Sequence, residues 1–375
     1  MTPGDRPVRV LIVHSRVGGG HLSAARALAA EFEAAGGQAH LIDAYIDAGR
    51  FPVTKFPTLY AWLARHQPLL WALLFHGSNT RLDPSPLLRP LLRPGLARAV
   101  SQAQPDVIVS VLPVINGLLV EAASETRVEV VLTDWHSVHR FWVARGVQHY
   151  TVPSESARLD CIRFGAPAGA VHVIGIPVRR AFAHEANVGA LRSRSLAGLG
   201  LDPGRFTVLM MVGAEGSPRA LASVARLVEM DIDAQVVVVC GRNEGLRRQV
   251  EGLRSQVSLR VLGFVEHVAD LMRSADVLVT KGGGLTLAEA FCCGVPVVVY
   301  DVLAGQESGN LQYVRSQGAV IQAASPRRLP GIVAELYADP PRRSDLAGRG
   351  RRLARPDAAE QIVASLLARV YAPSA

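Results

Sequence analysis

The chain has 375 residues, of which 49% are hydrophobic and only 19% are charged, and this composition excludes a disordered, fibrous or acidic-tail protein. At about 150 residues per domain, the length predicts two domains. The formal net charge is +8, and all but two of the 40 basic residues are arginines spread along the chain. Because no basic block alternates with aromatic side chains, we expect no nucleic-acid partner; an anionic membrane surface or an acidic ligand explains the charge.

The cysteines and the N-terminal segment indicate where the protein works. Four cysteines, two of them adjacent (Cys292 and Cys293), match neither a disulfide framework nor a zinc-binding pattern. Their apolar neighbours predict buried thiols in a reducing cytoplasm. The polar segment Met1–Pro7 leads directly into a strand-like segment, so we expect no secretion signal.

The first half of the chain alternates short apolar segments with helical stretches. Val8–His14 is the first expected strand, and three glycines separate it from a helix over about His21–Ala35. The next expected strands are Gln38–Asp43, Asp106–Val111, Val128–Thr133 and Gln148–Pro153. Continuous apolar strands separated by helices are typical of a parallel sheet with both faces covered.

The same alternation restarts in the second half of the chain. Strands are expected at Thr207–Val212, Gln235–Cys240, Leu259–Leu262, Asp276–Thr280 and Val295–Tyr300. The pattern therefore predicts an α/β protein with two doubly wound, Rossmann-like domains. We place the N-terminal domain at residues 1–175 and the C-terminal domain at 176–356. A final helix is expected in 357–375, and both alternatives stay open for it, packing on the C-terminal domain or back on the N-terminal domain. The polar, Pro- and Gly-flanked segment Gly175–Gly204 is the expected linker.

The apolar segment Phe56–Phe75, which contains Trp62 and Trp71, interrupts this alternation. It is about as long as a membrane span, but the charge and proline at its centre argue against one. One interpretation is a pair of buried helices broken at Pro68. The other is a surface insertion into the bilayer interface, anchored by Trp62 and Trp71, with the following arginines facing anionic headgroups. Those arginines are Arg81, Arg89, Arg93 and Arg98.

The first glycine-rich turn ends in Gly19, Gly20 and His21. Glycines let the backbone approach a ligand, and the helix they open directs N–H groups at it. The spacing matches neither a dinucleotide-binding nor a P-loop motif, so hydride transfer and P-loop chemistry are not expected. A helix start disfavours the cationic imidazole, so His21 is a candidate proton acceptor; alternatively, it only forms a hydrogen bond within the turn.

Asp134 follows a predicted strand of the same domain, with His136 and His139 close behind. A carboxylate at this position can orient a histidine and support its basicity. A zinc site built from these three residues has no fourth ligand at a suitable spacing, so we do not expect one.

The second domain contains the most specific motif, TKGGGLTLAEA over Thr280–Ala290. A strand ends, three glycines turn the chain, and a helix begins whose first amides can hold a diphosphate. Glu289, one turn into this helix, can bind ribose hydroxyls; the alternative is a solvated acid favoured by the helix dipole. The polar loop Asp301–Asn310 offers amides and carboxylates for a sugar, and Phe264 with Val265 offers backbone groups to a base.

Taken together, the motifs resemble the monogalactosyldiacylglycerol synthase and processive diacylglycerol glucosyltransferase family. The matching segments, in order, are GGGH, TDWH, GIPVR, CGRNEGL, GFVEHVADLM, TKGGGLTLAEA and GQESGN, between about residues 8 and 320. The chain is similar, more distantly, to the N-acetylglucosaminyltransferase that completes the lipid-linked peptidoglycan precursor. The resemblance implies a GT-B fold, inverting transfer from a UDP-sugar, and a membrane-lipid acceptor bound by the first domain.

The resemblance also implies roles for individual residues. His21 is the expected general base, with Asp134 as the second catalytic residue, and no metal or other cofactor is expected because a helix N-terminus stabilises the departing UDP. The expected nucleotide-sugar contacts are Arg179, Gly213, Arg242, Phe264, Val265, Gly283, Gly284, Leu285, Thr286, Glu289, Gln306 and Glu307. The expected acceptor or membrane contacts are Gly19, Gly20, Trp62 and Trp71.

The expected activity is transfer of glucose or galactose from UDP to diacylglycerol or a related lipid, by a protein attached to the cytoplasmic face of the cell membrane. The loops after Val212 and Asp301 depart from the family pattern near the donor sugar, so the sugar stays open. One alternative is transfer of N-acetylglucosamine to another lipid-linked acceptor. Another is a nucleotide-sugar-binding protein without turnover.

Overall fold

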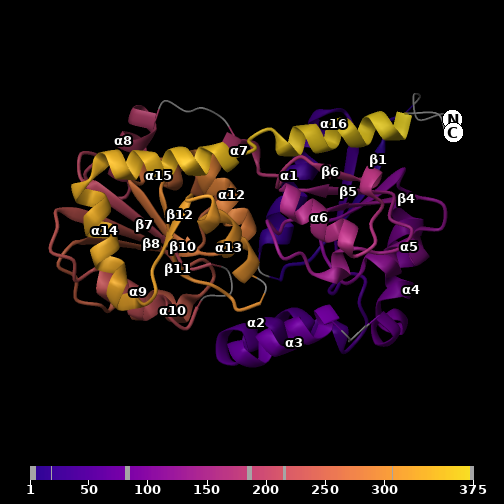
Figure 1. Ribbon diagram of the computed structural model, residues 1–375, viewed down its shortest axis with the longest axis horizontal. Coiled ribbons are helices and arrows are strands. Elements are labelled where there is room, and N and C mark those ends of the chain that lie inside the picture. The colour runs from indigo at the N-terminus through magenta and orange to yellow at the C-terminus, as the bar shows by residue number, and fades with distance from the viewer. Residues whose placement is uncertain are drawn as a thin grey trace. The chain divides into compact units, whose positions relative to one another are not determined.

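The computed structural model describes residues 6–17, 19–80, 85–183, 188–213, 217–305 and 307–371, which form two α/β units (Figure 1). Unit 1 contains the chain up to Leu63, Gln67–Arg180 and the segment from Arg355 onward. Unit 2 contains Ala181–Ala354 together with Ala64–His66. Each unit is built on one six-stranded parallel sheet, which confirms the predicted doubly wound α/β class.

The strand order of the first sheet is β2-β1-β3-β4-β5-β6. Its strands are β1 (Arg9–His14), β2 (Gln38–Asp43), β3 (Val107–Ser110), β4 (Arg127–Val131), β5 (His149–Val152) and β6 (Val171–Val173). The central strands β1, β3 and β4 are buried almost throughout. Helices cover both faces of such a sheet, which is why these strands are continuously apolar in sequence.

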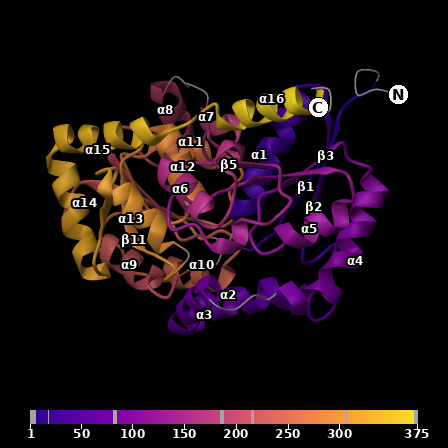
Figure 2. The ribbon, with the colours of Figure 1, turned by 45° about the vertical axis from the view of Figure 1, so that its right-hand side comes forward.

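The helices of unit 1 include one from the far end of the chain. They are α1 (Gly20–Ala34), α2 (Phe56–His66, whose last three residues are grouped with unit 2), α3 (Pro68–Thr80), α4 (Ser85–Ala103), α5 (Asn116–Ala123), α6 (Glu155–Arg163) and α16 (Ala358–Tyr371). Figure 2 shows α16, in yellow, beside α1. Ile362, Val363 and Leu366 of α16 share a buried core with Phe32 and strand β1.

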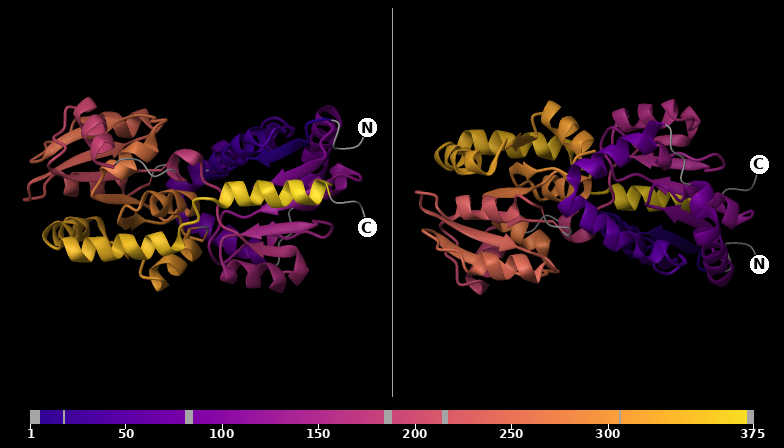
Figure 3. Two further views of the ribbon diagram at one scale, coloured as in Figure 1. Left: turned by 90° about the horizontal axis from the view of Figure 1, so that it is seen from above. Right: turned by 90° about the horizontal axis from the view of Figure 1, so that it is seen from below.

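The second sheet has the order β12-β11-β10-β7-β8-β9. Its strands are β7 (Phe206–Met211), β8 (Ala234–Val239), β9 (Ser258–Leu262), β10 (Val277–Lys281), β11 (Val297–Asp301) and β12 (Val320–Gln322). Figure 3 shows this sheet between two layers of helices. The helices from the domain boundary onward are α7 (Arg180–Ala183), α8 (Val188–Gly198), α9 (Ala220–Leu227), α10 (Glu244–Glu251), α11 (Val268–Ser274), α12 (Gly284–Cys293), α13 (Ser308–Ser316), α14 (Leu329–Ala338) and α15 (Pro340–Leu353).

The boundary between the two units, at Arg180 and Ala181, falls within the expected linker Gly175–Gly204. The segment is not extended throughout, because it contains α7 and α8. Helix α8 buries Leu191 and Leu196 and packs against α11. Its remaining positions are mostly small or polar, which hid the helix in the sequence.

The apolar segment forms two helices, as one interpretation predicted, with the break at Gln67 just before Pro68. Trp71 packs edge-on against the buried Tyr60, with ring centroids 4.8 Å apart, so these residues join α2 to α3. The outer face is not buried: Leu69 is 82% exposed, Leu73 is 72% exposed and Trp62 is 51% exposed. Within the described residues, no helix combines the length and apolar character needed to span a bilayer.

Candidate active site

Each sheet has one point where neighbouring strands send their connections in opposite directions. This point lies between β1 and β3 in the first sheet, and between β7 and β10 in the second. In open α/β sheets, ligands bind outside the carboxyl ends of the strands at such a point. The loops that follow these four strands are therefore the places to look for a site.

His21 is the second residue of α1 and lies at the carboxyl ends of β1 and β3. The helix begins after Gly19, whose φ of 73° places it in the left-handed region that glycine favours. Burial lowers the pKa of His21 to about 4, against a hydrogen bond with the backbone of Val111 that raises it. The Oγ1 atom of Thr133 lies 3.5 Å from His21 Nδ1. The imidazole is therefore neutral at pH 7 and able to accept a proton.

Asp134 follows β4, and its carboxylate accepts a 2.9 Å hydrogen bond from the indole Nε1 of Trp142. The indole is fully buried, and its ring centroid lies 6.0 Å from that of His21. Trp142 thus connects the predicted carboxylate to the predicted base.

The other two histidines near Asp134 hold local structure. His136 Nδ1 lies 2.5 Å from Ser156 Oγ and 3.9 Å from Asp160 Oδ2. His139 caps the 3-10 turn η2 (Arg140–Trp142). Over the part of the chain that the structure describes, no three His, Cys, Asp or Glu side chains are grouped so that they could hold a metal ion.

The structure adds His14 and Asp43, which the sequence analysis did not single out. His14 ends β1 and is buried, and its Nδ1 has no hydrogen-bond partner among the residues that the structure describes. Burial lowers its pKa. The Asp43 carboxylate ends β2 and accepts hydrogen bonds from the backbone N–H groups of Arg16, Tyr45 and Ile46 at 2.8–3.0 Å. Asp43 therefore orders the loops that follow both strands. Their place at the ends of two predicted strands was the signal available in the sequence.

In unit 2, strand β10 leads through Gly282 and Gly283 into α12. A Cβ atom on Gly282 would lie 2.7 Å from Val302 Cγ1, so a larger residue would require Val302 to move. Gly213, after β7, has φ +79° and lies beside the Lys281 side chain. Gly284, Leu285 and Thr286 form the first turn of α12, where backbone N–H groups lack intrahelical partners and favour an anion.

Glu289 lies further along α12 and is buried, with 7% of its surface exposed. The interpretation of Glu289 as a solvated acid is therefore wrong. Glu289 lies on the same helix as the predicted diphosphate site, which is the first turn of α12.

Glu307 fixes the loop after β11. Its Oε2 accepts a 2.7 Å hydrogen bond from the Leu303 backbone, and its Oε1 lies 3.5 Å from Lys281 Nζ. Ser217, after β7, donates a short hydrogen bond to Asp301 at the end of β11. Gln306 lies outside the described residues, as do residues 214–216 of the loop after Gly213.

Two residues predicted to contact the nucleotide, Arg242 and Phe264, lie side by side. The Arg242 guanidinium is 5.2 Å from the centre of the Phe264 ring, and Phe264 is 59% exposed. An exposed ring beside a guanidinium offers a stacking surface and a positive charge. Val265 is half-buried, and so is Arg179, which belongs to unit 1 and precedes α7.

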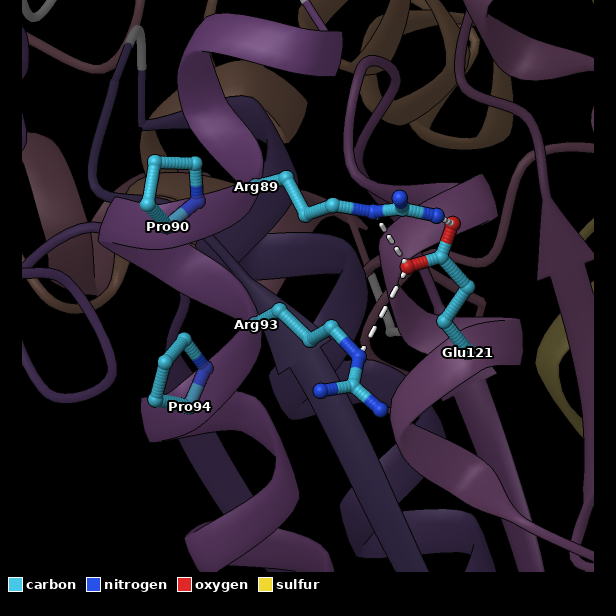
Figure 4. Close-up of a pocket in the computed structure, with 5 residues that line it drawn as sticks. All are labelled: Arg89, Pro90, Arg93, Pro94 and Glu121. Atoms are coloured by element: carbon cyan, nitrogen blue, oxygen red, sulfur yellow. Dashed lines mark hydrogen bonds and ion pairs between the residues drawn. The ribbon is translucent and has the colours of Figure 1, made fainter.

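A separate open pocket of about 460 Å³ lies between α4 and α5 (Figure 4). Arg89 contacts Glu121 through two hydrogen bonds, and Arg93 Nε lies 3.6 Å from the same carboxylate. Two arginines that were expected to face anionic headgroups therefore share one internal counter-ion. Arg98 is exposed, and Arg81 lies outside the described residues.

The chain is similar to known sequences over both units. Residues 21–178 match the profile described as Monogalactosyldiacylglycerol (MGDG) synthase, and residues 208–353 match Glycosyl transferases group 1. A probable monogalactosyldiacylglycerol synthase from Glycine max is 31% identical, covering 97% of this chain and 72% of that protein. The processive diacylglycerol beta-glucosyltransferase of Bacillus subtilis is 28% identical, covering 88% of this chain and 87% of that protein.

Solved structures share the fold at lower identity. MurG from Acinetobacter baumannii matches with a TM-score of 0.64 at 15% identity, covering 96% of this chain and 100% of that one. HepE from Anabaena, solved in complex with UDP-glucose, matches with a TM-score of 0.60 at 15% identity, covering 96% and 99%.

Proposed function

The chain belongs to the family of monogalactosyldiacylglycerol synthases and processive diacylglycerol glucosyltransferases, and on that premise we propose how its residues carry out the reaction. It is a GT-B glycosyltransferase that transfers a hexose from a UDP-sugar to diacylglycerol. One observation carries the assignment of His21 as the general base: it is a buried, neutral histidine at the start of α1. It follows β1, beside the point where the connections from β1 and β3 leave in opposite directions.

His21 is the general base. Its neutral ring accepts the proton of the diacylglycerol hydroxyl, and the resulting oxygen attacks the anomeric carbon of the donor while the bond to UDP breaks. Attack opposite the departing UDP inverts the anomeric centre. Trp142 lies against His21 and is held by Asp134, so the carboxylate stabilises the position of the base through the indole.

The donor binds to residues of unit 2 that follow strands β7, β8, β9, β10 and β11. The first turn of α12, from Gly283 to Thr286, holds the diphosphate and stabilises the charge that develops on UDP. Glu289 binds the ribose and Phe264 contacts the uracil. Arg242 contacts a phosphate or another part of the nucleotide, and Glu307 binds the sugar. Arg179, Gly213, Val265 and Gln306 complete the proposed contacts.

The acceptor reaches His21 from a membrane. The α2–α3 hairpin presents Leu69, Leu73 and Trp62 to solvent, which is the apolar surface that an interfacial helix buries in the headgroup region. Trp71 supports the hairpin from inside. Gly19 and Gly20, at the start of α1, are the proposed contacts of the acceptor glycerol.

The test is a donor screen against diacylglycerol in vesicles, with UDP-glucose, UDP-galactose and UDP-N-acetylglucosamine offered separately and the lipid product identified by mass spectrometry. A hexosyl-diacylglycerol product with release of UDP is expected from at least one of the first two donors. Product from the third donor alone would favour the N-acetylglucosamine alternative. Tight UDP-sugar binding without lipid product would favour a binding protein without turnover.

A further inference from the structure

His139 joins the exposed hairpin to the turn that carries Trp142. It precedes the 3-10 turn η2, and its Nδ1 accepts a 3.2 Å hydrogen bond from the Phe141 backbone N–H. The ring proton must therefore be on Nε2. That atom lies 3.2 Å from the Phe75 carbonyl and 3.1 Å from Ser78 Oγ, both near the end of α3.

The surroundings of His139 hold it in this arrangement. The side chain is buried, with ring centroids 4.8 Å from Phe75 and 4.5 Å from Phe141. Burial lowers its pKa to about 4, so a single neutral tautomer bridges the two elements at pH 7. A second link runs parallel to it, because Asn79 Oδ1 accepts a 2.8 Å hydrogen bond from the Arg140 backbone.

Trp142, at the end of η2, connects this turn to the proposed base His21. Asn116 donates a 2.9 Å hydrogen bond to the Trp142 carbonyl, which fixes the turn to α5. The Trp142 indole donates to Asp134 and packs beside His21. A continuous set of contacts thus runs from the end of α3 to His21.

We propose that His139 is a positioning residue that couples the α2–α3 hairpin to His21, so that seating the hairpin on a lipid surface fixes Trp142 and the base for transfer. This inference rests on the proposed function. It does not place His139 in contact with substrate: the residue acts through η2 and Trp142. If the hairpin and His21 are coupled in this way, turnover should be faster with a membrane-bound acceptor than with a dissolved one.

Two substitutions separate the contact of His139 with η2 from its contacts with α3. In His139→Asn, the side-chain oxygen takes the place of Nδ1 and still caps η2, but the shorter side chain cannot reach Phe75 or Ser78. In His139→Gln, the amide nitrogen takes the place of Nε2 and retains the link to α3. Asn79→Ala removes the parallel link and leaves His139 unchanged. Thr80→Ala is the control, because the hydrogen bonds of its hydroxyl within the described part of the chain go to carbonyls of its own helix.

The experiment compares kcat with diacylglycerol in vesicles and with a short-chain diacylglycerol below its aggregation concentration. We expect wild type to be faster with vesicles. His139→Asn should lower the vesicle-to-monomer ratio of kcat at least about tenfold, a typical cost of misplacing a catalytic group, and Asn79→Ala should lower it in the same direction. His139→Gln, Thr80→Ala and the KM for UDP-sugar should stay close to wild type.

A wild-type ratio in His139→Asn and in Asn79→Ala would overturn the proposal. Equal losses with both acceptors would also overturn it, since a merely structural role affects both alike. If His139→Asn does not fold, Asn79→Ala decides the outcome. Absence of lipid product from wild type with either acceptor would instead contradict the proposed function, whereas equal wild-type rates with both acceptors would contradict the coupling alone.

Discussion

His14, His21 and His139 are each more than nine-tenths buried in unit 1, and burial lowers the pKa of each imidazole. The unfolded chain takes up protons near pH 6.5, whereas folded His21 and His139 do so only near pH 4. Their contribution to stability is therefore complete above pH 6.5 and is lost as the pH falls through 4.

We expect the free energy of unfolding to decrease between pH 6.5 and 4, with each of these two histidines contributing up to about 3 kcal/mol. Urea unfolding at several pH values measures the change. His139→Gln should flatten the pH dependence of the unfolding free energy relative to wild type. An unaltered slope in His139→Gln would contradict the explanation.

Glu289 gives the sharpest test of donor binding. Glu289→Gln keeps the shape of the buried side chain and removes the charge, so UDP affinity should fall by more than about 1.5 kcal/mol, the lower range for a lost charge-assisted hydrogen bond. Calorimetry with UDP measures this. The matched control is Glu335→Gln, an exposed acid of the same unit that pairs with Arg342. Equal affinities in all three proteins would remove Glu289 from the ribose role.

The central strands of both sheets were predictable because both of their faces are buried. The expected strand Val8–His14 differs from β1 by one residue, and Thr207–Val212 differs from β7 by one residue at each end. The edge strand β2 coincides with the expected Gln38–Asp43, although it is only partly buried. Strands β6 and β12 were missed, since each has three residues and only its first is buried. Helix α8 was missed within the expected linker because its burial depends on α11, a contact that no local pattern records.

Candidate site residues were predictable where they lie in or directly after a glycine-rich turn, as His21 and Gly283 do. His14 and Asp43 have no such motif, and their importance appears only when β1 and β2 end side by side. The Trp142 connection was also unpredictable, because it depends on how η2 folds back toward α1.

The α2–α3 hairpin provides a prediction about membrane attachment. Leu69 and Leu73 are one helical turn apart and exposed, so Leu69→Ser with Leu73→Ser should weaken sedimentation with vesicles without lowering stability. Trp71→Ala should instead cost more than about 2 kcal/mol of stability, because it removes the packing against Tyr60. Vesicle sedimentation and urea unfolding distinguish the two effects. Unchanged sedimentation of the leucine variant would mean that another surface binds the membrane.

The C-terminal end of the chain returns to the first unit: α16 follows unit 2 in sequence but packs in unit 1. Arg369 of α16 forms two hydrogen bonds with the buried carboxylate of Glu129 in β4, at 3.0 and 2.5 Å. Arg127 donates to the Arg369 carbonyl at 2.5 Å. These contacts fix the C-terminal helix to the first sheet.

Arg369→Ala should destabilise the protein by about 3 kcal/mol, because Glu129 would remain buried without its counter-ion. Arg158→Ala, which removes an exposed pair with Glu155 in the same unit, should cost less than about 1 kcal/mol. Thermal and urea unfolding measure both. Similar stabilities of the two variants would show that α16 is held by its apolar contacts alone.

The most direct test of the account is the rate of hexosyl-diacylglycerol formation by His21→Ala, measured beside its affinity for UDP. The account predicts a folded protein with wild-type UDP affinity and at least about 100-fold slower transfer, the lower range for a lost general base. Transfer at the wild-type rate would contradict the account and assign proton removal to another residue, with Asp134 the next candidate.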